Sequence, residues 1–180
     1  RIISTLRKYN IKGGFFFTGE FFEMYPDVVR RLVAEGHYVG SHSYGHLLYA
    51  PWGNRDSLLV TKQEFEEDIF KSYKVLREFG ITDAPYFIPP YEHYNATISS
   101  WARQLGLQVI NYTPGTLTNG DYTTPEMKRY FSSKEILGRI WEYERTDSNG
   151  LNGHIMLIHF GTDPARTDKF YDKLPGLIRE

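Results

Sequence analysis

The chain has 180 residues, of which 41% are hydrophobic and 16% aromatic, which is enough apolar material for one sizeable core and predicts a single globular domain over residues 1–180. The formal net charge is −1 without any block of like charges, so neither a nucleic-acid partner nor an anionic membrane surface is indicated. The sequence has no apolar run of about 18 residues and no signal-peptide pattern, so it contains no predicted membrane span. Because the chain has no cysteine, the candidate metal ligands are His, Asp and Glu.

Helical and extended patterns alternate from the first residue. Residues 1–10 carry apolar side chains at helical spacing, and a break at residues 12–14 with its glycine pair follows, which predicts a helix. The aromatic run 15–18 is predicted to be a buried strand. Pro26 suits the first turn of a helix that ends at Gly36, and a short strand is expected at residues 38–39.

The middle of the chain repeats the same alternation. Thr61 and Glu64 have the spacing of a capping box, so they predict the start of a long helix that ends near residue 80. Residues 85–88 follow as a strand, and Asn95 is a suitable cap for a helix that ends near residue 105.

The last third contains two further predicted strands. Residues 107–112 are predicted as a strand, and a loop rich in Gly, Thr and Asn follows. Ser132 and Glu135 form a second capping box, which predicts a helix to about residue 145. The most strand-like stretch is 154–160, and a final helix is expected near Asp168.

Five alternations of strand and helix predict an α/β protein with parallel strands. Because ligands bind at the carboxyl ends of such strands, the polar groups placed there are candidates for a site. Five strands are too few to close a barrel, so we expect truncation at both ends. The polar groups that follow predicted strands are His42 and His46, residues 91–93, residues 111–121, and His159.

His42 and His46 are four positions apart, directly after a predicted strand. Two imidazoles at this spacing can face one way and share a divalent metal, which makes metal-assisted hydrolysis the leading functional interpretation. Solvated or core histidines are the alternative interpretation of the same spacing.

The ordered set of motifs resembles the polysaccharide deacetylases, which have the NodB-homology fold of carbohydrate esterase family 4. The matching segments are residues 14–20, 35–46, 89–91 and 157–159. The resemblance implies a distorted (β/α) barrel, incomplete in this chain, and a divalent metal, most commonly zinc, held by an aspartate and by His42 and His46. It also implies that an acetylated polysaccharide or oligosaccharide is the substrate, that acetyl groups on nitrogen or oxygen are removed, and that the protein is extracytoplasmic.

The sequence departs from the family pattern in three motifs. The Asp-Asp motif, which would carry the catalytic base and the third metal ligand, is expected upstream of Arg1. Ile88 stands where the family has an arginine, and Glu92 stands where it has a glycine. The Asp and Trp of a fourth motif are replaced by residues 113–116. A degenerate carbohydrate-binding domain is therefore the alternative function, and a metal hydrolase of another barrel family is a third.

The resemblance also suggests roles for four residues. His159 is the expected general acid, because an imidazole can donate a proton near neutral pH. Asp121 is the hypothesised carboxylate that orients it, although it could instead be a turn residue. Glu92 is an alternative orienter or substitute base, or a solvated loop carboxylate, and the backbone N–H of Tyr91 is the expected oxyanion donor.

The remaining histidines and aromatic residues receive weaker interpretations. His37 matches a family position and is expected to be structural packing. His93 and His154 are expected at the surface or at a strand edge. Several aromatic rings lie in or beside the strand-end loops, where they could stack on sugar faces or simply pack: Tyr44, Tyr49, Trp52, Tyr91, Tyr94 and Tyr122.

Overall fold

The computed structural model of the chain describes residues 1–179. The chain divides into two compact units, and each is described by itself: one is Lys12–Asn111, and the other combines Arg1–Ile11 with the segment that starts at Tyr112. The division does not test whether either unit folds alone, so the single domain expected from the length stays a prediction.

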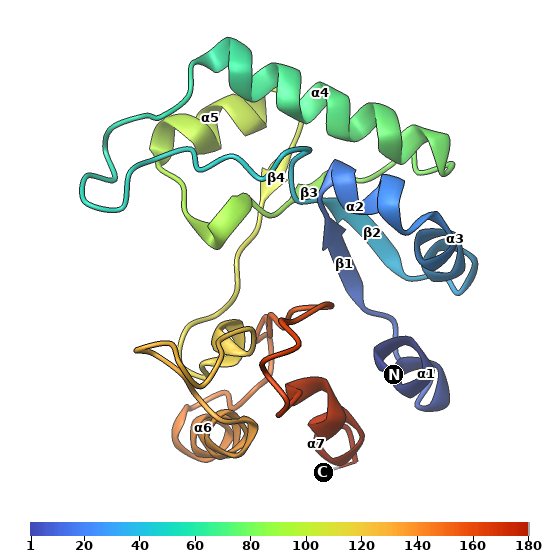
Figure 1. Cartoon of the computed structure of the whole chain (residues 1–180), viewed down its shortest axis with the longest axis vertical. Coiled ribbons are helices and arrows are strands. Elements are labelled where there is room, and N and C mark those ends of the chain that lie inside the picture. Colours follow the sequence, from blue (N-terminus) through green and yellow to red (C-terminus); the bar gives the residue numbers. More distant parts are fainter. Residues whose placement is uncertain (180) are drawn as a thin grey trace. The chain divides into compact units, whose positions relative to one another are not determined.

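The unit Lys12–Asn111 contains a four-stranded sheet (Figure 1). All neighbouring strands are parallel, which confirms the predicted α/β class. Phe17, Ser41, Phe87 and Val109 are neighbours across the sheet, so the carboxyl ends of the strands reach the same edge. The strands, in their order across the sheet, are β1 (Gly14–Phe17), β2 (Tyr38–Ser41), β3 (Tyr86–Phe87) and β4 (Gln108–Val109).

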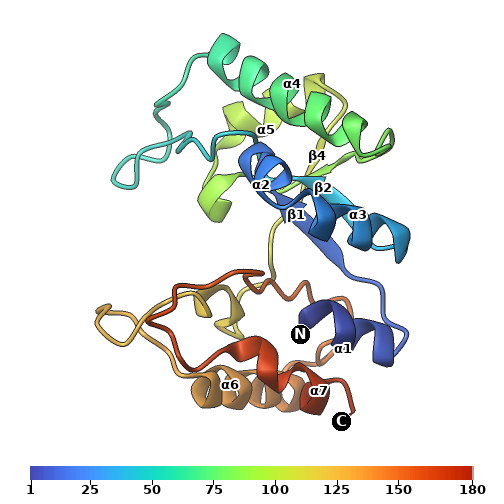
Figure 2. The same ribbon diagram turned by 45° about the vertical axis from the view of Figure 1, so that its right-hand side comes forward.

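Helices cover this sheet and connect its strands. Helices α3 and α4 contact β2, and α5 contacts β4 (Figure 1 and Figure 2). This arrangement follows from parallel strands, because each connection must return to the start of the next strand. The helices of the unit are α2 (Gly19–Met24), α3 (Pro26–Ala34), α4 (Lys62–Glu78), the 3₁₀ helix η1 (Pro90–Glu92) and α5 (Ala96–Gln104).

The predicted helix starts are confirmed by their hydrogen bonds. Pro26 is the first residue of α3. Thr61 and Glu64 make both bonds of a capping box at α4, and the Asn95 side chain accepts the backbone N–H of Ile98 at the start of α5. Helix α2 was not predicted from the sequence, because its six residues are too few for a helical period to emerge.

The core of this unit lies between α4, β3 and α5. It is built by fully buried side chains from these elements and from the loop that follows the histidine pair. Burial of such side chains is the main stabilising contribution to the unit. The buried residues of this cluster are Tyr49, Phe65, Ile69, Phe87, Ile98 and Ala102.

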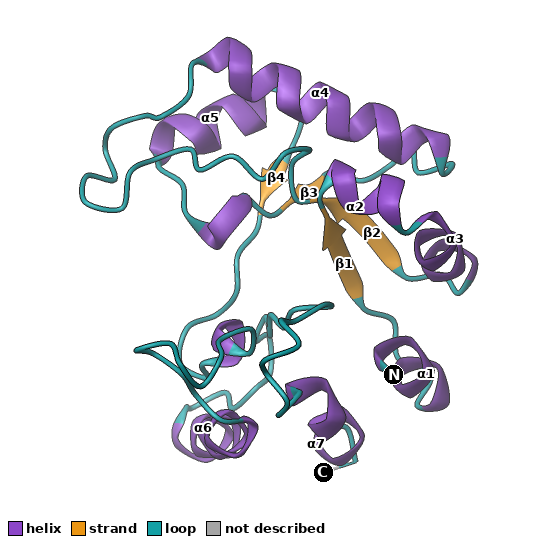
Figure 3. Ribbon diagram, in the orientation of Figure 1, coloured by secondary structure: helices purple, strands orange, loops and turns teal. Residues whose placement is uncertain are grey.

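The other unit consists of helices and loops (Figure 3). The predicted capping box of Ser132 and Glu135 is confirmed, and a small core forms around Ile136, Ile140 and Phe170. Among the described residues, no helix of either unit is long and apolar enough to cross a bilayer. The helices of this unit are α1 (Ile2–Lys8), η2 (Thr118–Gly120), α6 (Ser133–Thr146), η3 (Phe170–Lys173) and α7 (Leu174–Leu177).

The strand predicted at 154–160 is wrong, because none of these residues belongs to a strand. Ile155 accepts the backbone N–H of Thr113 at 2.9 Å, but its own N–H donates to the Thr113 side chain. The N–H of His159 donates to the carboxylate of Asp121. Side-chain oxygens thus accept the backbone N–H groups that a strand would donate to a neighbouring strand. The apolar pattern of the sequence does not show that a partner strand is missing.

Candidate functional site

The ring nitrogens of His42 and His46 converge at the carboxyl end of β2. The two Nε2 atoms are 3.1 Å apart. Nδ1 of His42 lies 2.8 Å from the carbonyl oxygen of Ile88. Because a carbonyl can only accept, Nδ1 carries the proton and the lone pair of Nε2 faces His46. Two nitrogens on a tetrahedral zinc ion at its usual bond lengths are about 3.3 Å apart, so this pair fits a zinc ion.

The loop that carries the pair has an unusual backbone. Ser43 and His46 have φ values of 67° and 56°, in the left-handed region that side chains disfavour. Ser43 Oγ accepts the N–H of His46 at 3.0 Å, and the carboxylate of Asp68 on α4 accepts the N–H groups of Tyr44 and Gly45 at 2.9 Å each. These bonds hold the loop in the conformation in which the two rings converge.

Asp68 is a residue that the sequence analysis missed. It lies on α4, 24 positions after Tyr44, so no local spacing links the two residues. The sequence shows only that Asp68 is an acidic residue on a helix that follows the histidine motif. Several other acidic residues lie on the same helix, so the sequence does not single out Asp68.

The convergent nitrogens of His42 and His46 are two candidate metal ligands. Within residues 1–179, no group of three His, Asp or Glu side chains is arranged to hold a metal. Catalytic zinc sites have three protein ligands, and the histidine pair would supply two of them.

Tyr91 and Glu92 follow β3, and the ring of Tyr91 contacts this loop. The Tyr91 ring lies 4.3 Å from the His46 ring, measured between centroids. Both residues have positive φ, 59° for Tyr91 and 52° for Glu92, and such a conformation costs a non-glycine residue roughly 1 kcal/mol or more. The Glu92 carbonyl accepts the Asn111 side-chain amide at 3.1 Å. Among the described residues, the N–H of Tyr91 has no hydrogen-bond acceptor, which leaves this donor available to a ligand.

Asp121 and His159, which belong to the other unit, are in direct contact. His159 Nδ1 lies 2.6 Å from Asp121 Oδ1, and the His159 backbone N–H donates to both carboxylate oxygens at 3.1 and 3.0 Å. Asp121 lies in a turn but is only 1% exposed, whereas the side chain of His159 is 33% exposed. The structure thus brings together the predicted acid and its predicted orienter, and their catalytic roles stay predictions.

The other histidines lie where packing explains them. His37 is buried, its Nδ1 accepts the N–H of Gly13 at 3.2 Å, and its ring contacts Phe15, which confirms the expected structural role. Burial lowers the pKa of His37. His93 packs against Trp52, and His154 packs against Tyr143.

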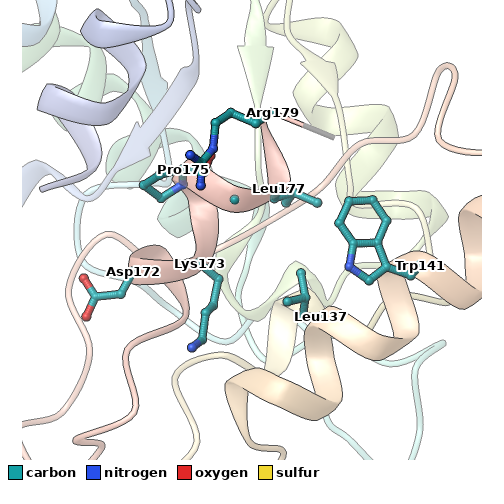
Figure 4. Close-up of a pocket in the computed structure, with 8 residues that line it drawn as sticks. Leu137, Trp141, Asp172, Lys173, Pro175, Leu177 and Arg179 are labelled. Atoms are coloured by element: carbon teal, nitrogen blue, oxygen red, sulfur yellow. The ribbon is translucent and has the colours of Figure 1, made fainter.

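A separate pocket of about 310 Å³ lies in the unit that contains α6 (Figure 4). It contains none of the site residues predicted from the sequence. Its lining combines the end of the described chain with two apolar side chains of α6: Leu137, Trp141, Asp172, Lys173, Pro175, Gly176, Leu177 and Arg179.

Comparison with known families gives a match to polysaccharide deacetylase over residues 1–110. A peptidoglycan-N-acetylglucosamine deacetylase of Bacillus cereus is 30% identical over 118 residues, which is 65% of this chain and 40% of that protein. A peptidoglycan-N-acetylmuramic acid deacetylase of Bacillus subtilis is 25% identical over 111 residues, or 61% of this chain and 39% of that protein. The matches thus span about two fifths of the length of these relatives.

Solved structures show the same fold at lower identity. A pseudoenzyme of the CE4 family from Bacillus anthracis matches with a TM-score of 0.73 and 19% identity, over 99% of this chain and 53% of that one. A family 4 carbohydrate esterase from Streptomyces lividans, solved with acetate, matches with a TM-score of 0.71 and 19% identity, over 99% of this chain and 78% of that one.

Proposed function

Because the chain belongs to the polysaccharide deacetylase family, we propose that it is a metal-dependent hydrolase that removes acetyl groups from N- or O-acetylated sugars of a polysaccharide. The observation that carries this proposal is the convergence of the Nε2 atoms of His42 and His46, with the tautomer of His42 set by the Ile88 carbonyl. A histidine retained only for packing has no need of this arrangement.

His42 and His46 would hold the metal, and zinc is the ion that suits two imidazole ligands at this separation. A divalent metal supplies Lewis-acid polarisation of the acetyl oxygen and a lowered pKa of water. The N–H of Tyr91 would donate a hydrogen bond to the developing oxyanion, a use supported by its lack of another acceptor among residues 1–179. Glu92 is the candidate for a substitute base.

His159 would give a proton to the leaving nitrogen or oxygen of the sugar. Its contact with Asp121 supports this role, because a buried carboxylate at 2.6 Å holds the imidazole in one orientation. Glu92 is then not needed as an orienter.

The proposed substrate is an acetylated glycan of the peptidoglycan or chitin type, in line with the names of the relatives. Such polymers lie outside the cytoplasm, so we propose an extracytoplasmic protein.

A specific observation favours the alternative of a catalytically degenerate carbohydrate-binding domain. No third metal ligand stands beside the histidine pair within residues 1–179, and Ile88 replaces the arginine of the family motif. The two functions differ in one measurable property, which is the release of acetate.

The test combines zinc binding with acetate release. Equilibrium dialysis of the chain against zinc should give one bound ion, lost in His42→Ala and in His46→Ala but kept in His154→Ala, which removes a histidine that packs against Tyr143 in the other unit. Acetate release from a pentamer of N-acetylglucosamine should follow the same order. A chain that binds no zinc and releases no acetate would overturn the enzyme proposal.

A further inference from the structure

We propose that Trp52, Tyr91 and His93, here called the Trp52 platform, form a subsite that binds a neutral sugar ring next to the residue being deacetylated. This inference rests on the proposed function and adds to it a specificity-determining surface.

The platform is a continuous row of rings that begins at the histidine pair. The Tyr91 ring lies 4.3 Å from His46 and 5.8 Å from Trp52, which it meets edge to face at 82°. The Trp52 indole also lies 4.4 Å from the His93 ring. All of these residues belong to one compact unit, so their spacing is set within it.

Trp52 and Tyr91 are nevertheless open to solvent, with exposed fractions of 63% and 46%. Large apolar rings that gather at the surface beside a candidate site are typical of binding surfaces, because exposing them to water is unfavourable. A ligand that covers both rings would recover that free energy.

The loop that carries Trp52 is anchored on both sides of the indole. Tyr49 and Ala50, just before it, are fully buried, and the Tyr49 carbonyl accepts the N–H of Leu59 at 2.9 Å. The side-chain amide of Asn95 donates to the carbonyls of Arg55 and Ser57 at 3.0 and 3.1 Å. Trp52 is therefore presented by a hydrogen-bonded loop, which reduces the ordering cost of binding.

The chemistry of the platform suits a sugar. A pyranose ring has an apolar C–H face that can stack on an aromatic ring and a rim of hydroxyls that need hydrogen-bond partners. Trp and Tyr provide both, because each combines an apolar face with one polar group at its edge. His93 adds an imidazole to the same row. The position next to His46 places this subsite beside the sugar whose acetyl group would be hydrolysed.

The test compares Trp52→Ala and the conservative Trp52→Phe with Phe70→Ala, which removes an equally exposed ring (57%) from α4. With a pentamer of N-acetylglucosamine, Trp52→Ala should raise KM about 5-fold to 10-fold at unchanged kcat, as expected for one aromatic contact. Trp52→Phe should restore most of the affinity, and Phe70→Ala should have the KM of the wild type. With a single acetylated sugar, which cannot reach the platform and the histidine pair together, all four proteins should have the same KM.

Calorimetric titration with the same pentamer separates this inference from the proposed function. Binding that weakens in Trp52→Ala, in a chain that releases no acetate, would support the platform and overturn the enzyme. Acetate release with the same KM in wild type and Trp52→Ala would overturn the platform and leave the enzyme standing. A wild-type dimer that becomes a monomer in Trp52→Ala would also overturn the platform, because a second copy of the chain would then cover Trp52.

Discussion

Nδ1 of His159 lies 2.6 Å from Oδ1 of Asp121, although the two residues are 38 positions apart. The carboxylate is buried and also accepts the backbone N–H of His159, so it fixes both the main chain and the ring of one residue. Such a carboxylate restricts the imidazole to one orientation, which general acid catalysis requires.

We expect His159→Ala to lower kcat for acetate release by roughly 10²- to 10⁴-fold, the range of general acid catalysis. Asp121→Asn keeps an oxygen acceptor but removes the charge, so we expect a smaller loss of roughly 10- to 100-fold. Zinc content, measured by atomic emission, should equal that of the wild type in both variants. A parallel loss of zinc would contradict the assignment of His159 as an acid.

Asp68 is not a candidate metal ligand, but its hydrogen bonds with Tyr44 and Gly45 predict that it affects metal affinity through the loop. Asp68→Ala should lower zinc affinity roughly 10- to 100-fold, because the loop between His42 and His46 loses two charge-assisted hydrogen bonds. Competition with a chromophoric chelator measures this.

Glu67→Ala is the matched control for Asp68→Ala. It removes the neighbouring carboxylate of α4, whose hydrogen bond with Gln63 is exposed, and should leave zinc affinity unchanged. Equal affinities of Asp68→Ala and wild type would show that the loop holds its shape without this carboxylate.

His37 predicts a pH dependence of stability. Burial, with a smaller contribution from Lys12, lowers its pKa in the folded chain, whereas the unfolded value is about 6.5. Below that pH the unfolded chain binds more protons, so the free energy of unfolding falls as the pH decreases toward the folded pKa. Urea unfolding between pH 7.5 and pH 5.5 should reveal this loss.

The comparison for His37 is the His37→Asn variant, which retains an acceptor for the N–H of Gly13 but does not titrate. Its stability should fall less over the same pH interval. Burial also lowers the pKa of His154, which lies in the other unit, so this residue too lowers the free energy of unfolding as the pH decreases. Wild type and His37→Asn should therefore share this part of the pH dependence. Parallel curves over the whole interval would disprove the contribution of His37.

Arg166 predicts a large effect on the stability of the unit that holds Asp121. Its guanidinium is fully buried and donates to the carbonyl oxygens of Asp168, Thr123 and Phe131 at 2.9, 2.7 and 3.0 Å. Arg166→Met should lower the free energy of unfolding by about 3 kcal/mol or more, because one buried and two partly buried carbonyl acceptors lose their donor.

Arg166→Lys should recover less than half of this loss, since an ammonium group cannot reach acceptors arranged around a planar fork. Arg139→Met, which breaks an exposed ion pair with Glu142, should change stability by less than about 0.5 kcal/mol. Urea unfolding followed by circular dichroism measures all three variants. A loss in Arg166→Met as small as that in Arg139→Met would contradict the buried network.

The elements that the sequence predicted well depend on residues close together in the chain. The helix starts at Thr61, Asn95 and Ser132 each rest on a hydrogen bond to a backbone N–H three residues later, so their spacing is already present in the sequence. The α/β class with parallel strands was predicted from the alternation of strands and helices along the chain. The histidine pair was recognised from a short sequence motif, in which the two residues are four positions apart.

The contacts between residues far apart in the chain were decided only by the tertiary structure. The strand expected at 154–160 is absent because a strand needs a backbone partner, and side chains of Thr113 and Asp121 occupy the donors instead. Asp68 reaches Tyr44 across 24 positions, and Trp52 meets His93 only because both flanking segments are anchored on one unit. Local hydrogen bonds are encoded by spacing along the chain, whereas these contacts exist only after packing has brought their partners within reach.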